Sequence, residues 1–421
     1  MNTMPGTFAN LFCDISQPAS KIGQTMRIVF MAGGFSTTNV LFLNKFLQYG
    51  LDAHFVYTRM SPADFEVLKS VNTTWIDLSR FKYLPKLLRW LIFGYETISI
   101  IKKIKPDVIL TQGIQVHGLF SVLSGIRPIL LMPWGSDWAI VAHKNSAMRL
   151  LSRYVVNHVD LVQIDCEVGK RTILELSQGK VKPEDILVFP QGIELDVFKP
   201  KAEIRKNLRD QLEWNDKKVL IMTRQLRPVY GIDIFLRAVA EIIKEVPDVR
   251  ALIVGDGPLE LELKTLACSL GLSESVRFIG RVDREELVNY LNAGDIYVST
   301  SYSDGTSLCL LEAMAVGLPA VVTDVPANLE WVNNGHNGFI ARRGVSESVK
   351  EALLRLLQNA EIRRLFGERN LRIAKERADW DKNFEQFMRM FKLLSQGMEG
   401  SQKCQVPETT LVQNDTDHRG S

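Results

Sequence analysis

The chain has few cysteines and no long apolar segment. Its five cysteines are scattered and odd in number, and no two have the spacing of a metal site or a redox pair, which favours a reducing compartment. No apolar run reaches the length of about 18 residues that a membrane-spanning helix needs. The first residues lack the basic start and apolar core of a signal peptide. We therefore expect a protein that works in the cytoplasm.

A strong net charge and a metal-ligand cluster are also missing. The formal net charge of the 421 residues is +3, which is too small to predict a nucleic-acid partner. The histidines and carboxylates form no recognisable ligand cluster, so we predict no metal site. The hydrophobic content of 46% is ordinary for a globular protein, and the length allows two or three domains.

Short apolar runs alternate with helical patterns twice along the chain. The first series begins with a buried strand at Met26, and the second begins after Pro200. This rhythm predicts an α/β protein with two doubly wound, Rossmann-like domains, whose strand ends face a central cleft. The predicted divisions are a flexible leader at 1–25, an N-terminal domain at 26–197, a C-terminal domain at 198–375, a terminal helix at 376–395 and a disordered tail at 396–421.

Residues 303–319 carry the most information. They place two carboxylates, Asp304 and Glu312, eight residues apart across a predicted loop-to-helix junction. Between them, Thr306 and Ser307 suit a tight turn and a helix N-cap. Exposed amides at a helix start hold phosphate, and a carboxylate two turns into the same helix can accept hydrogen bonds from ribose hydroxyls. One short element can therefore hold a nucleotide-sugar at two places.

Five pieces of the chain occur in the order and with the gaps of a known family. They are Thr223 to Gly231, Val254 to Pro258, Phe278 to Gly280, Asp304 to Pro319 and Asn334 to Phe339. On these pieces the chain resembles the retaining glycosyltransferases of family 4, which have the GT-B fold. The resemblance implies a nucleotide-diphosphate sugar as donor substrate, a glycan or lipid-linked acceptor and no cofactor. It also implies that the terminal helix crosses back to the N-terminal domain.

The predicted phosphate site centres on Arg224. This arginine follows a strand and precedes a helix, where it can fork onto a diphosphate. In the family a lysine stands six residues later, where this chain has Tyr230, and Arg227 is the available substitute. Surface ion pairs are the alternative interpretation for both arginines.

The resemblance implies that Glu312 holds the ribose and that Asp304 contacts the donor sugar. Asp304 is one methylene shorter than the usual glutamate, which leaves the sugar open. A solvated helix-face carboxylate is the alternative for Glu312, and an ordinary turn is the alternative for Asp304. The other donor-binding candidates are the amides of Thr306, Ser307 and Leu308 at the phosphates, Gly280, Arg281 and Val282 at the base, and Gly33 and Gly34 at the diphosphate or sugar.

Catalytic candidates are fewer. His117 and Asp137 each follow a predicted strand of the N-terminal domain, and either can take the proton of the acceptor hydroxyl or serve only in structure. Asp304 is the third candidate. Retaining transfer does not require a strong base, because the departing diphosphate oxygen can accept that proton.

Residues 80–95 interleave large apolar side chains with Arg80, Lys82, Lys86 and Arg89. Such a helix can lie on an anionic membrane surface, as would suit a lipid-linked acceptor. A core helix whose basic side faces water is the alternative.

The sequence thus predicts a retaining, metal-independent glycosyltransferase of polysaccharide or glycolipid assembly, cytoplasmic or peripheral on the cytoplasmic face of a membrane. Because of Tyr230 and Asp304, a nucleotide-sugar-binding protein without transferase activity stays open as an alternative. A nucleotide-sugar epimerase on the same fold is a further alternative.

Overall fold

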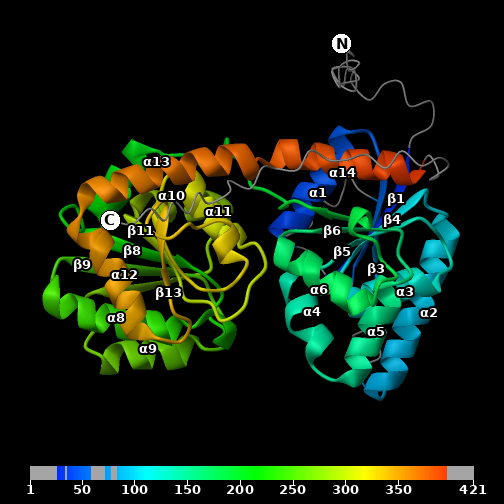
Figure 1. Cartoon of the computed structure of the whole chain (residues 1–421), viewed down its shortest axis with the longest axis horizontal. Helices are drawn as coiled ribbons and strands as arrows, with labels where there is room; N and C mark the ends of the chain where they lie inside the picture. Colours follow the sequence, from blue (N-terminus) through cyan, green and yellow to red (C-terminus); the bar gives the residue numbers. More distant parts are fainter. Residues whose placement is uncertain (1–25, 34–35, 58–71, 77–82, 396–421) are drawn as a thin grey trace, which may run out of the picture. The chain divides into compact units, whose positions relative to one another are not determined.

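The computed structural model describes residues 26–33, 36–57, 72–76 and 83–395 (Figure 1). The chain divides into two compact units, Met1–Met132 with His158–Asp160, and Pro133–Asn157 with Leu161–Ser421. Several sequence predictions lie outside the described residues: the leader at 1–25, the tail at 396–421, Gly34, Arg80, Phe81 and Lys82.

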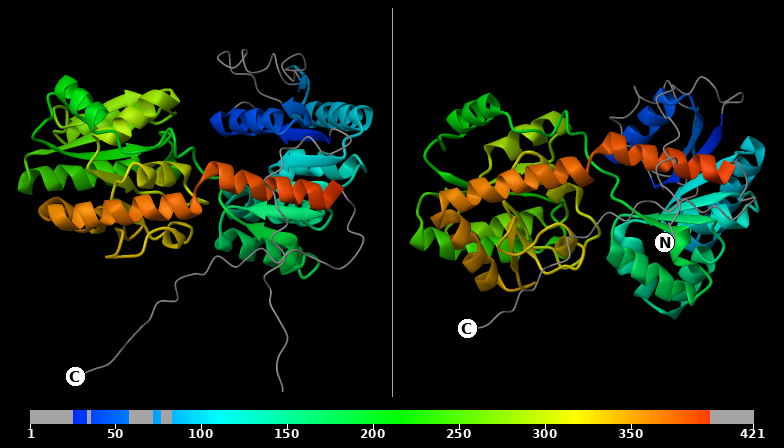
Figure 2. Two further views of the ribbon diagram at one scale, coloured as in Figure 1. Left: turned by 90° about the horizontal axis from the view of Figure 1, so that it is seen from above. Right: turned by 45° about the horizontal axis from the view of Figure 1, so that its top comes forward.

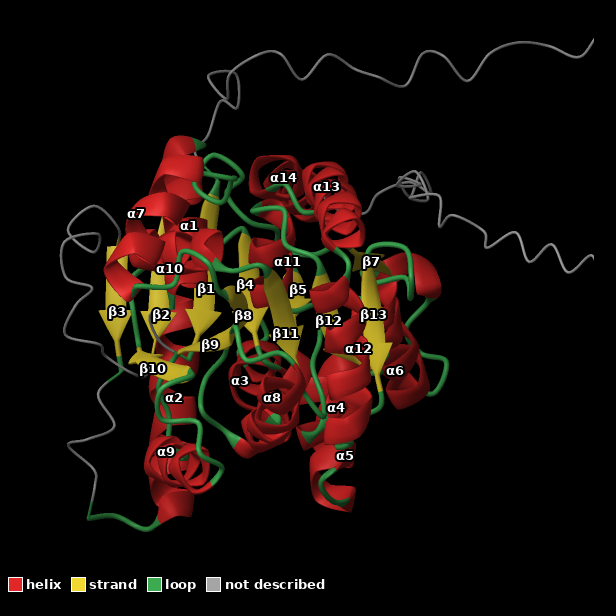
Figure 3. Cartoon of the chain, turned by 90° about the vertical axis from the view of Figure 1, so that its left-hand side faces the viewer, coloured by secondary structure: helices red, strands yellow, loops and turns green. Residues whose placement is uncertain are grey.

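One sheet has seven strands in the order β3-β2-β1-β4-β5-β6-β7. In Figure 3 the arrowheads of β1, β2 and β3 point the same way, as their parallel pairing requires. The strands are β1 (Arg27–Ala32), β2 (Asp52–Tyr57), β3 (Asn72–Trp75), β4 (Val108–Gln112), β5 (Ile129–Met132), β6 (Leu161–Ile164) and β7 (Ile186–Val188). The helical segments between them are α1 (Thr37–Gln48), α2 (Lys86–Ile104), η4 (Ile114–Gly118), α3 (Leu119–Leu123), α4 (Gly135–Ala139), η5 (Val141–His143), α5 (Ser146–Val156), α6 (Glu167–Ser177) and η6 (Pro183–Asp185).

The interior strand β1 is apolar from Ile28 to Ala32 because both faces of the sheet are covered. Its residues 28–32 have no exposed surface. On one face the Phe30 ring lies 5.8 Å from the rings of Phe42 and Phe46 in α1 and 5.2 Å from that of Phe55 in β2. A continuous buried run of this kind is typical of a parallel strand between helix layers.

The second sheet has six strands, all paired in parallel, in the order β10-β9-β8-β11-β12-β13. The strands are β8 (Lys218–Thr223), β9 (Val249–Val254), β10 (Val276–Gly280), β11 (Ile296–Ser299), β12 (Ala320–Thr323) and β13 (Gly338–Ala341). The helical segments are α7 (Ala202–Leu212), η7 (Pro228–Tyr230), α8 (Ile232–Glu245), α9 (Glu260–Ser269), α10 (Arg284–Ala293), α11 (Leu308–Ala315), η8 (Asn328–Glu330), α12 (Ser346–Gln358), α13 (Ala360–Arg377) and α14 (Trp380–Ser395).

Each face of the six-stranded sheet carries its own apolar core. Along β8, Leu220 and Met222 join one core, while Val219 and Ile221 join the other. This alternation follows from the two-residue period of side chains on a strand. Two doubly wound parallel sheets, as predicted, are therefore confirmed.

The helical pattern predicted near the C-terminus forms two helices, α13 and α14, which follow one another in Figure 2. The break comes at Ala378, whose carbonyl accepts a hydrogen bond from the Ile193 amide (2.8 Å). The Trp380 amide in turn donates to the Ile193 carbonyl (3.0 Å), so this segment pairs like a strand. The domain boundaries and the crossing of the terminal helix stay predictions.

Candidate functional site

The strand order of the six-stranded sheet locates its ligand edge. The order runs outward from β8 on one side and from β11 on the other, so the connections leave these adjacent strands in opposite directions. Ligands of doubly wound folds bind outside the carboxyl ends of the strands at such a point. Arg224 directly follows β8, and the loop with Asp304 follows β11. Tertiary structure thus brings two predicted site residues to the expected place.

Arg224 is the centre of this edge. Its Nη2 donates to Asp304 Oδ2 (2.5 Å) and to the hydroxyl of Ser307. The guanidinium also faces the Tyr230 ring, with 5.0 Å from Cζ to the ring centre. The two hydrogen bonds join residues about eighty positions apart in the chain and hold the arginine against the start of α11.

Arg224 is 8% exposed but stays charged. Burial is the largest single effect and lowers the pKa of its guanidinium, but the interactions with Asp304, Tyr297, Cys309 and Tyr230 together outweigh it, so the pKa is raised. Its Nε is buried and has no hydrogen-bond partner among the described residues. A buried donor without a partner is costly, so it favours an acceptor such as a phosphate oxygen at this place.

The start of α11 supplies further donors. Ser307 is its N-cap, as predicted, and the hydroxyl accepts from the Leu310 amide (3.2 Å). The Thr306 amide donates to Asp165 Oδ2 (3.0 Å) in the same compact unit. No described residue accepts from the amides of Ser307 and Leu308, and the positive end of the helix dipole lies there.

Glu312 lies in the second turn of α11, between neighbours that are fully buried. Burial raises the pKa of its carboxyl to about 7, against the opposing charges of Arg284 and Arg224. Arg284 starts α10, pairs with Glu194 and covers the Phe198 ring at 5.2 Å. The carboxyl group is therefore held near two cations, and ligand hydroxyls that favour its ionised form would bind it well.

Two glycine turns bring the loops of this edge close together. Gly255 has φ +143°, and a Cβ built there would lie 2.1 Å from the Arg224 carbonyl oxygen. Gly231, at the start of α8, has φ +58°, and its Cβ would lie 2.5 Å from the Thr300 carbonyl oxygen. Any larger side chain would displace the backbone on which Arg224 is mounted.

The other donor-side candidates lie farther out. Gly280 ends β10, and its carbonyl accepts from the Gly255 amide (2.8 Å). Arg281 is exposed, whereas Val282 is half-buried against the core. Arg227 is exposed at the start of η7 and makes no ion pair with any described residue. The structure does not bring these four side chains into contact with Arg224.

In the seven-stranded sheet the order reverses between β1 and β4. Gly33 and His117 follow these strands, and a Cβ built on Gly33 would lie 3.8 Å from His117 Cε1. Burial lowers the pKa of His117 to about 4, although a hydrogen bond with the Gln112 backbone opposes the shift. Its Nε2 is buried without a hydrogen-bond partner among the described residues, so the neutral ring can accept a proton.

Asp137 lies in the short helix α4. Its carboxylate accepts from the Trp134 amide (2.9 Å), and burial raises its pKa to about 6. The amide contact opposes that shift and holds the turn at the start of α4.

The sequence interpretation missed two residues of the Arg224 edge. Arg284 is the first residue of α10, directly after the N-cap Asp283. Its position after β10 was the one sequence feature that indicated a site. Thr300 follows β11, and its hydroxyl donates to the carbonyls of Tyr230 (3.0 Å) and Gly231 (2.8 Å). Neither belongs to a charged motif that the spacing of residues would reveal.

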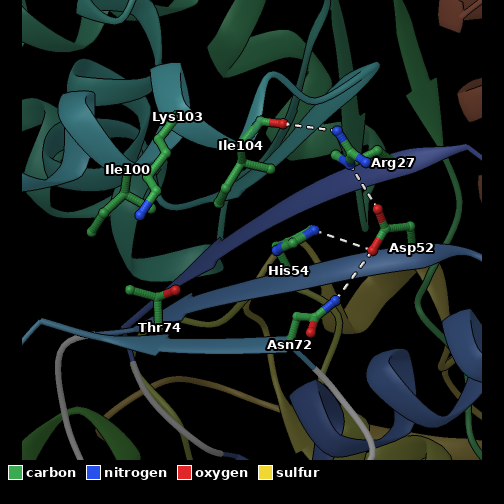
Figure 4. Close-up of a pocket in the computed structure, with 8 residues that line it drawn as sticks. All are labelled: Arg27, Asp52, His54, Asn72, Thr74, Ile100, Lys103 and Ile104. Carbon is green, nitrogen blue, oxygen red and sulfur yellow. Dashed lines mark hydrogen bonds and ion pairs between the residues drawn. The ribbon is translucent and has the colours of Figure 1, made fainter.

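A separate pocket of about 470 Å³ lies at the opposite edge of the seven-stranded sheet (Figure 4). It is lined by the first residues of β1, β2 and β3, namely Arg27, Asp52 and Asn72. Asp52 accepts from Arg27 (2.6 Å) and from Asn72 (3.2 Å). These groups satisfy one another at the amino ends of the strands, so the pocket is not the predicted donor site.

Among the residues that the structure describes, no group of three or more His, Cys, Asp or Glu side chains could hold a metal ion. No helix among them is both long enough and apolar enough to cross a bilayer.

Solved structures share this fold. The structure of a protein from Anabaena in complex with UDP and glucose has a TM-score of 0.76 at 18% identity, covering 88% of this chain and all of that one. A sucrose-phosphate synthase from Thermosynechococcus elongatus has a TM-score of 0.73, also at 18% identity, covering 87% and 98%. At these identities the likeness establishes the fold. Two parallel sheets of this kind, matched to these structures, define the GT-B class of glycosyltransferases.

Family models specify the class further. Glycosyl transferases group 1 matches residues 204–373, and glycosyl transferase 4-like matches residues 27–165. The chain belongs to this family of group 1, family 4 glycosyltransferases.

Curated relatives agree with the family. A glycosyltransferase from Haemophilus influenzae is 25% identical over 81% of this chain and 92% of its own length. The alpha-monoglucosyldiacylglycerol synthase of Streptococcus pneumoniae is 34% identical over 57% of this chain and 56% of its own length. A glycosyltransferase from Methanocaldococcus jannaschii is matched over 62% of its length. Several relatives are thus matched over only part of their length.

Proposed function

We propose that the protein is a retaining glycosyltransferase that moves a sugar from a nucleotide-diphosphate donor to a glycan or lipid-linked acceptor. One observation carries the proposal. A buried arginine whose Nε has no hydrogen-bond partner among the described residues lies beside the start of α11, and a carboxyl group, Glu312, lies in the second turn of the same helix. This arrangement offers cationic donors to a diphosphate and an acceptor to the hydroxyls of a pentose.

The chemistry assigned to the site is mainly electrostatic. The bond between the anomeric carbon and the diphosphate oxygen breaks, and its electron pair leaves with the diphosphate. Arg224 and the amides at the start of α11 stabilise that developing charge. The acceptor oxygen bonds to the anomeric carbon on the face that the diphosphate leaves, and its proton passes to the departing oxygen. Positive charge builds on the sugar as this happens.

We propose that this reaction requires no metal ion. Mg²⁺ in other phosphoryl and diphosphate sites neutralises the charge of the leaving group. Here Arg224 and the amides at the start of α11 neutralise that charge.

Transfer is favoured over the alternatives of an inactive binding protein or an epimerase. Both family models describe glycosyl transferases, and the named relatives are transferases or synthases. Where the family has a lysine, this chain has Tyr230, whose neutral ring contacts the Arg224 guanidinium. Arg224 therefore keeps a side-chain contact at this position.

The proposal is tested by incubating the purified protein with a panel of nucleotide-sugars, beginning with UDP-glucose, since the Anabaena relative holds UDP and glucose. Diacylglycerol and glycan primers serve as acceptors. We expect release of the nucleotide diphosphate, a product whose anomeric configuration matches the donor by NMR, and unchanged rates in EDTA. An inverted product contradicts retention, loss of activity in EDTA contradicts metal independence, and no binding of any nucleotide diphosphate contradicts the whole proposal.

We further propose that α2 binds an anionic membrane surface, on its cytoplasmic face, and that the protein binds its acceptor there. Gly94 fixes the orientation of this helix, because a Cβ there would lie 2.3 Å from the Phe120 ring. The inner side carries Phe93, Thr97 and Ile101. The outward side carries four exposed large residues: Leu87 is 69% exposed, Leu88 43%, Leu91 53% and Tyr95 75%.

The exposed side of α2 is basic as well as apolar. Lys86 lies at its start, and Lys102 and Lys103 lie in its last turn, all exposed to solvent. A helix whose apolar residues were all buried, the alternative considered from the sequence, would not leave leucines in water. Exposed leucines flanked by lysines fit the headgroup region of an anionic bilayer.

We expect the protein to sediment with vesicles that contain phosphatidylglycerol and not with phosphatidylcholine vesicles. Lys102→Glu with Lys103→Glu should weaken binding at least about tenfold, because each basic residue near such a surface contributes about 1 kcal/mol. Leu87→Glu with Leu91→Glu should abolish it. Leu261→Glu, at an 80% exposed leucine of α9, is the matched control and should bind as the wild type does. Equal binding by all variants would rule out α2 as the docking surface.

A further inference from the structure

Tyr230 lies against the Arg224 guanidinium. Its ring centre is 5.0 Å from the Arg224 guanidinium carbon, within the range of a cation–π contact. It occupies the last position of η7, directly before the glycine at which α8 begins. The ring is therefore part of the same edge as Arg224 and Ser307.

The backbone of Tyr230 is held from both sides. Its amide donates to the Arg227 carbonyl (3.1 Å), and its carbonyl accepts from the Thr300 hydroxyl (3.0 Å). The side chain is half-buried, and no described residue hydrogen-bonds its hydroxyl. The Tyr230 hydroxyl thus has no hydrogen-bond partner among the described residues, and the same holds for the buried Nε of the guanidinium that its ring contacts.

We propose that Tyr230 holds Arg224 in position with its ring and donates its hydroxyl to an oxygen of the donor diphosphate. This inference rests on the proposed function and adds a specific ligand group to it. The ligand group bound here is a diphosphate because its oxygens only accept hydrogen bonds. The Tyr230 hydroxyl and Arg224 Nε are both donors, and neither has an acceptor among the described residues.

At the position of Tyr230, a neutral hydrogen-bond donor is energetically more favourable than a second cation. Arg224 is already paired with Asp304, and a further positive charge about 5 Å away would repel the guanidinium. The phenol keeps its proton, since burial raises the pKa of Tyr230 above its usual value. The hydroxyl can therefore donate across the working range of pH.

The test compares diphosphate binding with nucleoside binding. For whichever of UDP and GDP binds the wild type, we expect Tyr230→Phe to weaken the diphosphate about tenfold or more, since hydrogen bonds to charged groups are among the stronger ones. The matching nucleoside, which has no phosphate, should bind both proteins equally. Tyr230→Ala should weaken the diphosphate further, because Arg224 loses the ring as well. Tyr290→Phe removes the hydroxyl of another half-buried tyrosine in the same unit and should change nothing.

The outcomes separate this inference from the proposed function. If the wild type binds a diphosphate and Tyr230→Phe binds it equally well, the role of the hydroxyl is excluded. If Tyr230→Phe loses diphosphate and nucleoside alike, the tyrosine is only structural and the inference also fails. If the wild type itself binds neither UDP nor GDP, the proposed function is what fails.

Discussion

Arg224→Ala is expected to lower the rate of sugar transfer by about 10²–10³, the usual effect of removing one donor that stabilises transition-state charge. The arginine is buried at the switch point of the six-stranded sheet and stays charged there. The turnover of a purified variant with saturating donor measures the effect. Most of the loss should fall on kcat, because the charge on the leaving diphosphate grows as the reaction proceeds.

Arg224→Lys distinguishes charge from geometry. Lysine keeps the cation but cannot present parallel donors to Asp304, Ser307 and a phosphate together. We expect it to recover only part of the lost rate. The matched control is Arg364→Ala on α13, which removes an arginine that is paired with Glu361 and Glu368 on the surface. Activity of Arg224→Ala equal to that of this control would refute the site.

Glu312→Gln should weaken nucleotide binding about 10- to 100-fold and yet stabilise the fold above pH 7. The first effect follows because hydrogen bonds from ribose hydroxyls to a carboxylate contribute about 1.5–3 kcal/mol, which an amide does not supply. The second follows because burial raises the pKa of Glu312 to about 7, so the fold disfavours its ionised form.

The sign of the pH dependence follows from that shift. A carboxyl group whose pKa is raised by folding contributes stability below its unfolded pKa, and this contribution is lost as pH rises to about 7. At pH 8 the thermal midpoint of Glu312→Gln should therefore exceed that of the wild type, and the two should converge in acid.

Ligand binding should show the opposite trend. Uridine or guanosine, which have no phosphate that could titrate near this pH, should bind the wild type more tightly as pH rises through about 7, and the variant should show no such rise. Glu286→Gln, at the exposed capping residue of α10, is the control for removing a carboxylate nearby. A variant that keeps both the affinity and the pH profile of the wild type would remove Glu312 from the site.

Local sequence was enough for the elements that position the site. Apolar runs such as residues 219–222 and 251–254 lie in strands, because the part of a strand that is buried on both faces is apolar. Ser307 caps α11 as its residue type and place predict. The motif pieces located Arg224 and Glu312 as candidates, although they left the partners of each side chain open.

The orientation of α2, the helix with basic and apolar residues, could not be predicted from the sequence alone. Its sequence is compatible with a core helix and with a surface helix, since both need one apolar side. Only the close approach of Gly94 to Phe120 decides which side of α2 faces inward and leaves Leu87, Leu91 and Tyr95 in solvent.

By itself, then, the amino-acid sequence determined the alternation of strands and helices, the capped start of α11 and the residue types available for a diphosphate and a pentose. Tertiary structure decided which of them meet. The ion pair of Arg224 with Asp304 and that of Arg284 with Glu194 each join segments that follow different strands. The ring of Tyr230 reaches the Arg224 guanidinium within the segment that follows β8. Such contacts depend on strand order and on loops closing within a few ångströms, and neither is encoded in the spacing of residues along the chain.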